Sequence, residues 1–566
     1  MRRLSFALLL PLYAIAADRP PVPQFTDPTC RATLEAALPQ VTAVFEQFWR
    51  DQHVPGLVFG VVIDGDLVLV KGFGEQNRET HAPVTPDSVF RIASMTKSFT
   101  ALAILQLRDA GKLSLEDPVS KWIPEIAGLN YPTRDTAPLR IRNLLTHGAG
   151  FPEDNPWGDR QLATPDATLT QLLKQGLPFS TPPDTAYEYS NYGFALLGRI
   201  VARASGVPYN EYIRRHILEP LHLRSATLDP ADVPASVRAQ GYGRSGDAYT
   251  EIPSLGYGAF SSMGGMLLNA RDLGRYVAFH LSAWPPRDDP ETGPVRRSSV
   301  REMQHPWRPS GFHPERFSAY GYGLAVTQIC QYQRYVSHSG GLPGFGSNMA
   351  WLPYHGVGIF VMTNLTYTAG ATAVEQSFEV LRKTGALQPR ELPPSSELLT
   401  TRDQILRVWD SRQDLAVIAA DNLFLDSPAS DRLQQIHRLK ERAGACQSAG
   451  ALRPENLLRG SFTIPCQSAN VRVFFTLAPT IPPKVQRLDF TVVPHLDPAA
   501  ERAVETRAHQ FGNCRFDEVD AWLGSFRASV RLECEHGSRL AQIEIGSDGK
   551  LRNIALSVPG EGRCAP

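Results

Sequence analysis

Ser94 and Lys97 stand three residues apart at the start of a long apolar stretch, and together these residue types could carry out nucleophilic catalysis. On a helix this spacing puts both side chains on one face, with Cβ atoms roughly 5–6 Å apart. From Phe99 to Leu107 the stretch is apolar nearly all round, which predicts a helix buried in a core. Burial and the positive end of the helix dipole both disfavour an ammonium. Lys97 is therefore either held by partners or partly neutral, and a neutral amine can take the proton of Ser94. The alternative is a capping serine and a surface lysine.

A seryl nucleophile also needs a second proton carrier, and a polar loop at residues 187–193 offers one. Tyr189 and Asn191 stand two apart in this loop, so both can point the same way from an extended backbone. A phenol beside Lys97 would have its pKa lowered by the ammonium and could carry protons. The alternative for Tyr189 is a core tyrosine with its hydroxyl satisfied.

Glycines follow His338 at the end of a predicted strand, in the stretch 337–344. Such a strand beside the serine can present a backbone N–H to a developing oxyanion. Gly340 and Gly341 would also let a substrate approach closely. The alternative is a glycine-rich turn between strands with a surface histidine.

These three stretches, in this order and at these separations, resemble the serine β-lactamase and penicillin-recognising enzyme superfamily. Ser94-Met95-Thr96-Lys97 matches its Ser-x-x-Lys motif, Tyr189-Ser190-Asn191 matches its Tyr-x-Asn motif, and His338-Ser339-Gly340 occupies the place of Lys-Thr-Gly. The resemblance is closest to the class C-like branch, which includes D-Ala-D-Ala carboxypeptidases, D-aminopeptidases and esterases. It extends over roughly residues 31–385, and the segments 144–150 and 320–324 contribute to it.

Carried over to this chain, the resemblance implies that Ser94 is acylated while Lys97 and Tyr189 exchange its proton. It implies that Asn191 hydrogen-bonds the substrate, and that the backbone N–H groups of Ser94 and Gly341 form the oxyanion hole.

The chain departs from many β-lactamases at His338, where they carry a lysine. A neutral imidazole is a weaker anchor for a substrate carboxylate, so efficient β-lactam hydrolysis is not expected. Histidine is usual at this place in the carboxypeptidase- and esterase-like members, so the resemblance still implies catalysis.

Other functional patterns fit the chain less well. The sequence contains neither a Gly-x-Ser-x-Gly elbow nor a His-Glu-x-x-His metal motif, so we expect no cofactor and no metal. The formal net charge is zero, which argues against nucleic acid or an anionic membrane as partner. In the family, the segment that holds His147 is a structural turn, so we expect a structural role for this residue.

The first sixteen residues have the pattern of a signal peptide. Arg2 and Arg3 precede the apolar run 4–15, and Ala14-Ile15-Ala16 supplies a small-residue cleavage pattern. The run is too short to span a bilayer. We therefore expect an exported protein, periplasmic or secreted, with no membrane span.

The remaining pattern predicts an α/β (α+β) domain over residues 17–388. Helices are expected at 32–49, from Ser94 to near Gly111, at 195–204 and at 372–382. A hairpin is expected at 56–70, and strands at 324–326, 334–338, 347–352 and 357–363. This order predicts an antiparallel sheet flanked by helices, with an all-α region inserted between the two parts of the sheet.

A proline-rich linker at residues 389–400 leads to a smaller α+β domain at 401–566, which is internally duplicated. The copies span about 426–496 and 497–562, each a helix followed by a strand meander. Cys446 and Cys466 are 20 residues apart, as are Cys514 and Cys534, so we predict one disulfide in each copy. The pairing of Cys30, Cys330 and Cys564 is left open.

The sequence thus predicts an exported serine hydrolase that forms a seryl acyl-enzyme with a small-molecule or peptide substrate. D-peptides, peptidoglycan stems, β-lactams and esters are the candidate substrates. The alternative is a catalytically idle binding or sensor protein on the same scaffold. Neither the oligomeric state nor the role of the duplicated domain follows from the sequence.

Overall fold

The computed structural model describes residues 20–313, 316–329, 331–511 and 513–557. The predicted signal peptide, residues 1–16, lies outside the described residues, as do Cys330 and Cys564. Within the described part, no helix combines the length and the apolar composition needed to cross a membrane.

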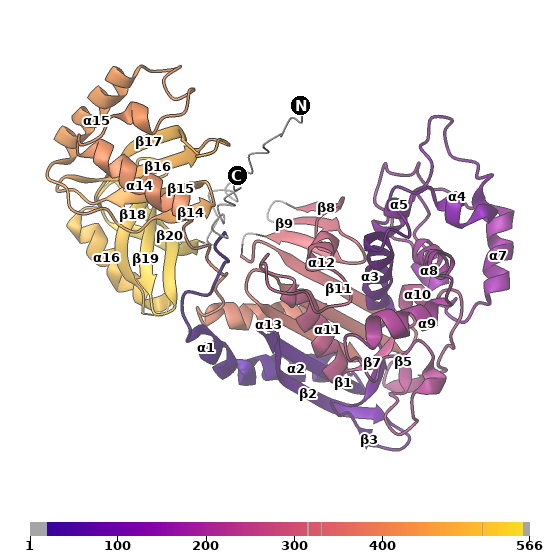
Figure 1. Cartoon of the computed structure of the whole chain (residues 1–566). Coiled ribbons are helices and arrows are strands. Elements are labelled where there is room, and N and C mark those ends of the chain that lie inside the picture. The colour runs from indigo at the N-terminus through magenta and orange to yellow at the C-terminus, as the bar shows by residue number, and fades with distance from the viewer. Residues whose placement is uncertain (1–19, 314–315, 330, 512, 558–566) are drawn as a thin grey trace, which may run out of the picture.

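A nine-stranded sheet forms the centre of the larger, N-terminal domain (Figure 1). Its strands, in spatial order, are β3 (Ala82–Pro83), β2 (Asp66–Asn77), β1 (Gly56–Ile63), β13 (Val357–Thr363), β12 (Phe345–Leu352), β11 (Tyr335–Leu342), β10 (Ala325–Ile329), β9 (Arg316–Tyr320) and β8 (Arg308–His313). Neighbouring strands pair antiparallel, which confirms the predicted sheet. The pairing of β1 with β13 joins the beginning and the end of the domain.

The hairpin of β8 and β9 extends the sheet beyond the predicted strands. β8 is largely exposed, and its sequence mixes arginine, proline, serine, glycine and histidine with one phenylalanine. It therefore lacks the alternation of apolar and polar residues that predicts a strand.

Helices cover both faces of the sheet. One face is covered by α1 (Cys30–Ala36), α2 (Leu38–Asp51) and α13 (Ala371–Lys383), and the other by α11 (Ala270–Ser282) and the helical region that contains the candidate serine. Strand β1 contributes side chains to the apolar cores on both faces of the sheet, because successive side chains of a strand point to opposite faces. Phe59 packs in the cluster with α2 and α13, whereas Val58 packs in the other cluster.

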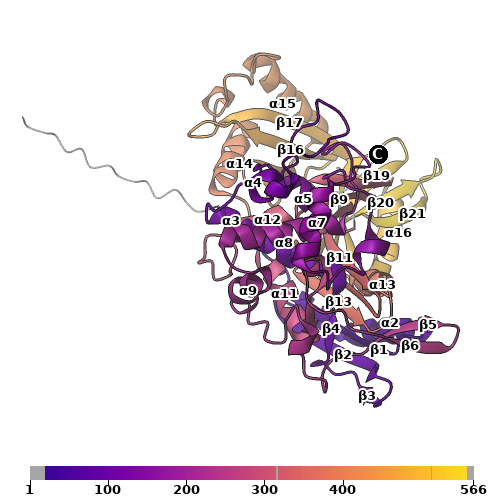
Figure 2. The same cartoon turned by 90° about the vertical axis from the view of Figure 1, so that its right-hand side faces the viewer.

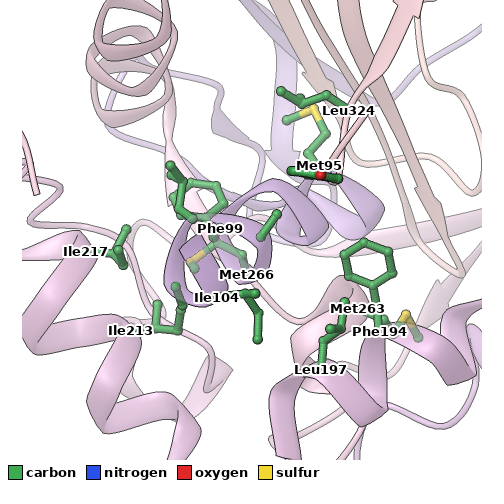
Figure 3. Packing of buried hydrophobic residues seen from close by; sticks show 14 of the residues in the cluster. Met95, Phe99, Ile104, Phe194, Leu197, Ile213, Ile217, Met263, Met266 and Leu324 are labelled. Carbon is green, nitrogen blue, oxygen red and sulfur yellow. The ribbon is translucent and has the colours of Figure 1, made fainter. Parts of the chain in front are cut away.

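The helical region is built around α3, which is buried along nearly its whole length. Its helices are α3 (Thr96–Asp109), α4 (Val119–Trp122), α5 (Ile141–Leu145), α6 (Asn155–Gly158), α7 (Asp166–Gln175), α8 (Asn191–Ser205), α9 (Tyr209–Ile213), α10 (Ser261–Gly264) and, nearer the sheet, α12 (Arg297–Met303). Figure 3 shows α3 between Ile213 and Ile217 on one side and Phe194, Leu197 and Met263 on the other.

Two small ladders interrupt the region that was expected to be all-α. β4 (Val89–Arg91) pairs with β7 (Leu267–Asn269), and β5 (Gly241–Ser245) forms a hairpin with β6 (Ala248–Ile252). The first ladder has three residues a strand, which is too short for a periodic pattern. This β4–β7 ladder fixes the position of the segment that leads to Ser94.

The C-terminal domain contains two units, each with a helix followed by a four-stranded sheet. α14 (Ser396–Trp409) begins inside the predicted linker 389–400 and packs into the core of the first copy. The first copy has α15 (Ala429–Ala443), β14 (Arg453–Asn456), β15 (Arg459–Ile464), β16 (Ala469–Leu477) and β17 (Val485–Pro494). The second has α16 (Pro498–Ala508), β18 (Arg515–Trp522), β19 (Arg527–Cys534), β20 (Gly537–Ile545) and β21 (Leu551–Ser557).

Each copy folds as a four-stranded antiparallel meander with its own apolar core. The disulfides Cys446–Cys466 and Cys514–Cys534 are both formed, which confirms the predicted pairing, and Cys30 is a buried free thiol. Figure 1 and Figure 2 both place this domain away from the β2–β3 edge of the large sheet.

Loss of the first disulfide should destabilise the first copy. The bond closes a 20-residue separation, so the chain-entropy model assigns it about 3 kcal/mol. We expect the double variant Cys446→Ser/Cys466→Ser to unfold at lower denaturant, measured by tryptophan fluorescence, to which Trp409 in that core contributes. Equal midpoints for variant and wild type would contradict the assignment.

Candidate active site

Ser94 lies in a tight turn between β4 and α3. The turn is the 3-10 segment η1 (Ala93–Met95), and Ala93 adopts a φ of 48°, a left-handed conformation that non-glycine residues rarely take. Two hydroxyls hold the turn: Thr96 Oγ1 donates to the Ala93 carbonyl at 2.6 Å, and Ser347 Oγ donates to the Ile92 carbonyl at 2.8 Å. The turn thus places Ser94 at the mouth of the buried helix.

Lys97 is fully buried one turn later, and its Nζ donates three hydrogen bonds. The acceptors are Ser94 Oγ at 3.0 Å, Asn191 Oδ1 at 2.7 Å and the Met263 carbonyl at 2.8 Å. Each N–H of an ammonium therefore has an acceptor. Burial lowers the pKa of Lys97 to about 7, against the opposing effect of the Asp159 and Asp154 carboxylates.

Tyr189 reaches the same serine from the loop before α8. Its hydroxyl hydrogen-bonds Ser94, and its ring lies 4.8 Å from Lys97 Nζ. The expected lowering of its pKa does not occur: burial raises the pKa of Tyr189 well above its ordinary value, and this outweighs the hydrogen bond from Ser94. Desolvation of the buried phenol, which the charge of a neighbouring lysine cannot offset, decides the direction of the shift. Tyr189 is therefore a neutral phenol.

His147 packs against Tyr189 and holds its loop. The two rings are 4.2 Å apart, the Ser190 backbone N–H donates to His147 Nδ1 at 3.0 Å, and the Glu188 N–H donates to the His147 carbonyl at 2.9 Å. Because Nδ1 accepts, the proton of the neutral ring is on Nε2. Burial holds the pKa of His147 well below its usual range.

Asn191, the first residue of α8, has its amide group occupied by protein atoms. Its Oδ1 accepts from Lys97, and its Nδ2 donates to Asn155 Oδ1 at 3.0 Å and reaches Asp159 Oδ1 at 3.5 Å. The two Asp154 carboxylate oxygens accept from the backbone N–H groups of Asn191 and Tyr192, both at 2.7 Å. In this structure Asn191 therefore orients Lys97.

Asp159 and Tyr367 belong to this network and were not anticipated from the sequence. Tyr367 donates to Asp159 Oδ2 at 3.0 Å, and burial raises the pKa of Asp159 to about 6. The partners are 208 residues apart, and neither lies in a motif, so no local signal could have paired them.

The two glycines of β11 have different neighbours. A Cβ on Gly340 would lie 2.2 Å from the Ile92 carbonyl oxygen, so its lack of a side chain lets β11 pack against the turn that carries Ser94. A Cβ on Gly341 would lie 2.6 Å from Cδ1 of Tyr367. The close approach expected at Gly340 is therefore made by the protein's own backbone.

His338 is buried beside Tyr320. The Tyr320 hydroxyl and His338 Nε2 are 2.8 Å apart, and His338 Nδ1 lies 2.6 Å from the Ser339 carbonyl. A carbonyl only accepts, so the proton is on Nδ1 and Nε2 accepts from the tyrosine. Burial lowers the pKa of His338 to about 3. The ring is neutral and both nitrogens are occupied, so it offers no charged anchor.

The family model for beta-lactamase matches residues 41–381, which is more than half of the chain. The chain belongs to the beta-lactamase family. It is similar to "Beta-lactamase-like protein 2" of Dictyostelium discoideum, at 32% identity over 45% of this chain, and to "Protein flp" of Staphylococcus aureus, at 28% identity over 58% of this chain. The matched regions span only 47% and 63% of those relatives' own lengths.

The fold is also that of a known structure, the octameric penicillin-binding protein homologue from Pyrococcus abyssi. The TM-score is 0.54 at 20% identity, and the match covers 92% of this chain and 98% of that chain. At this identity the likeness shows the fold alone.

The neighbouring glycines provide a matched test of the packing around this beta-lactamase-family site. Gly340→Ala should lower the free energy of unfolding by about 1–3 kcal/mol, because the Ile92 carbonyl cannot move without disturbing the turn. Gly341→Ala should cost less, because the half-exposed Tyr367 ring can move away at the loss of its hydrogen bond to Asp159. Denaturant unfolding of both variants measures the difference, and equal losses would contradict this account.

Proposed function

We propose that this protein is a serine hydrolase that cleaves amide or ester bonds through an acyl-enzyme on Ser94. The observation that carries the proposal is the shared hydroxyl: Ser94 Oγ accepts from Lys97 Nζ at 3.0 Å and also hydrogen-bonds Tyr189. A nucleophile in contact with a base and a second proton carrier is the arrangement that seryl acyl transfer requires.

In the acylation step, the neutral amine of Lys97 takes the proton of Ser94 as Oγ attacks the substrate carbonyl carbon. The negative charge moves to the carbonyl oxygen, where the backbone N–H groups of Ser94 and Gly341 stabilise it. Tyr189 then gives its proton to the departing amine or alkoxide and regains one from the Lys97 ammonium. Water subsequently attacks the ester on Ser94 and releases the acid.

The pKa values of the two proton carriers support these roles. Lys97, with a pKa of about 7, can alternate between amine and ammonium near neutral pH. Tyr189, whose pKa is raised, keeps its proton until a leaving group needs it. His147 and Asn191 act as positioning residues that hold Tyr189 and Lys97.

His338 bears on the choice among substrates. A neutral, buried imidazole cannot attract a carboxylate in the way a lysine would. We therefore place D-peptides and small esters ahead of β-lactams. The two disulfides, together with the signal-like segment 1–16, support export to a periplasmic or extracellular location.

Covalent labelling tests the proposal. A fluorophosphonate probe should label the wild type, and Ser94→Ala should reduce labelling to background because the nucleophile is gone. Ser98→Ala is the matched control on the same helix, since its hydroxyl donates to the Met95 carbonyl at 2.7 Å and takes no part in the network of Lys97. Labelling of Ser94→Ala at the wild-type level would favour the idle scaffold.

The pH dependence of ester hydrolysis should report on Lys97. The base is active when neutral, so kcat/KM should fall as the pH drops below about 7. The Asp159 carboxylate raises the pKa of Lys97, so Asp159→Asn should move this acidic limb to lower pH, by about one unit. The exposed Asp135→Asn is the control. If the acidic side of the pH profile of kcat/KM is unchanged in Asp159→Asn, Asp159 does not raise the pKa of Lys97 and the account is contradicted.

A further inference from the structure

Three side chains of metal-ligating type meet where the chain entering α1 passes beside the second copy of the C-terminal unit (Figure 1). They are Asp27, Cys30 and His536, and one ligand atom from each lies within 4.8 Å of the other two. His536 follows β19, 509 residues after Asp27, so no sequence motif could reveal the group.

The Asp27 carboxylate is already oriented toward the other two side chains. Its Oδ1 accepts from the Thr29 backbone N–H and from Thr29 Oγ1, both at 2.7 Å. These bonds leave Oδ2 facing His536 Nδ1 at 2.8 Å and Cys30 Sγ at 3.7 Å; Thr29 Oγ1 also lies 2.8 Å from Oδ2. Hydrogen bonds from residues that are not themselves ligands, such as Thr29, commonly orient metal-binding carboxylates.

The separations suit a small tetrahedral ion. Metal–ligand distances of about 2.0–2.3 Å give ligand–ligand separations of about 3.3–3.8 Å in such a site. The distance from Cys30 Sγ to Asp27 Oδ2 already falls in this range, and the distance from Oδ2 to His536 Nδ1 needs to open by about half an ångström. Thiolate, imidazole and carboxylate together are a ligand set for Zn²⁺.

The Cys30 thiol is buried at the edge of an apolar core, and it donates a weak hydrogen bond to Asp27 Oδ2 at 3.7 Å. Cys30 is buried and free of a disulfide, in a chain whose described cysteines are otherwise paired. Burial and the Asp27 carboxylate raise the pKa of Cys30 to about 11. A divalent cation reverses this balance, because its charge favours the thiolate.

We infer that Asp27, Cys30 and His536 bind one Zn²⁺ ion, with water in the fourth position. The Cys30 thiol loses its proton to solvent as the Zn–S bond forms. The ion then joins the start of α1 and the residues just before it to the loop between β19 and β20. The competing interpretation is a plain ion pair between Asp27 and His536, which makes no use of the cysteine.

Cobalt substitution separates these interpretations in the full-length protein. After dialysis against a chelator, we expect one equivalent of Co²⁺ to produce a thiolate-to-cobalt charge-transfer band, which Zn²⁺ then abolishes by displacement. Cys30→Ser should abolish the band, and His536→Gln should weaken Co²⁺ binding at least tenfold. Cys330→Ser and Cys564→Ser are matched thiol controls and should retain it.

A wild-type protein without the band, or a Cys30→Ser protein that keeps it, would overturn the inference in favour of the ion pair. Fluorophosphonate labelling of Ser94 should be equal with and without metal, so failure of the zinc site and failure of the proposed hydrolase activity are distinguishable.

Discussion

The burial of the Lys97 ammonium is the constraint on which the rest of the site depends. Removing such a charge from water costs several kcal/mol unless hydrogen bonds and opposite charges compensate. The fold supplies that compensation from separate elements: Ser94 from η1, Asn191 from the start of α8, and the Met263 carbonyl from α10. Because one cation needs all three, α3, α8 and α10 must pack in one arrangement. Burial nevertheless keeps the pKa of Lys97 at about 7, and Nζ stays in contact with the serine.

The large sheet contributes backbone contacts to the site rather than a charged side chain. β11 can lie against the turn before Ser94 only because Gly340 has no side chain. A chain of polar contacts then runs from Lys97 through Asn191 and Asp159 to Tyr367, whose ring lies over Gly341. The proposed proton carriers and the proposed oxyanion strand are therefore held by one network. His338, which is neutral and has both ring nitrogens occupied, adds no charge to β11 at the position where many β-lactamases carry a lysine.

Features with a local pattern could be predicted from the sequence, and features made by tertiary contact could not. The antiparallel sheet, the buried α3 and both disulfides follow from periodicity, motif spacing and the duplicated cysteines. The placement of Ser94, Lys97 and Tyr189 side by side follows from motifs. The exposed, polar β8 gave no periodic signal, and Asp159 and Tyr367 meet across 208 residues. The pKa of Tyr189 was predicted in the wrong direction, because the extent of its burial is a property of the packed fold.

The account therefore depends most on the ionisation of one lysine, which can be measured directly. Protein labelled with ¹³C at the lysine ε-carbons would be titrated by NMR, and the signal missing from Lys97→Met assigns the residue. The account predicts that this signal titrates with a pKa of about 7, well below that of the surface lysines. A Lys97 signal that titrates together with the surface lysines would show a permanently charged ammonium, and would contradict its role as the base that activates Ser94.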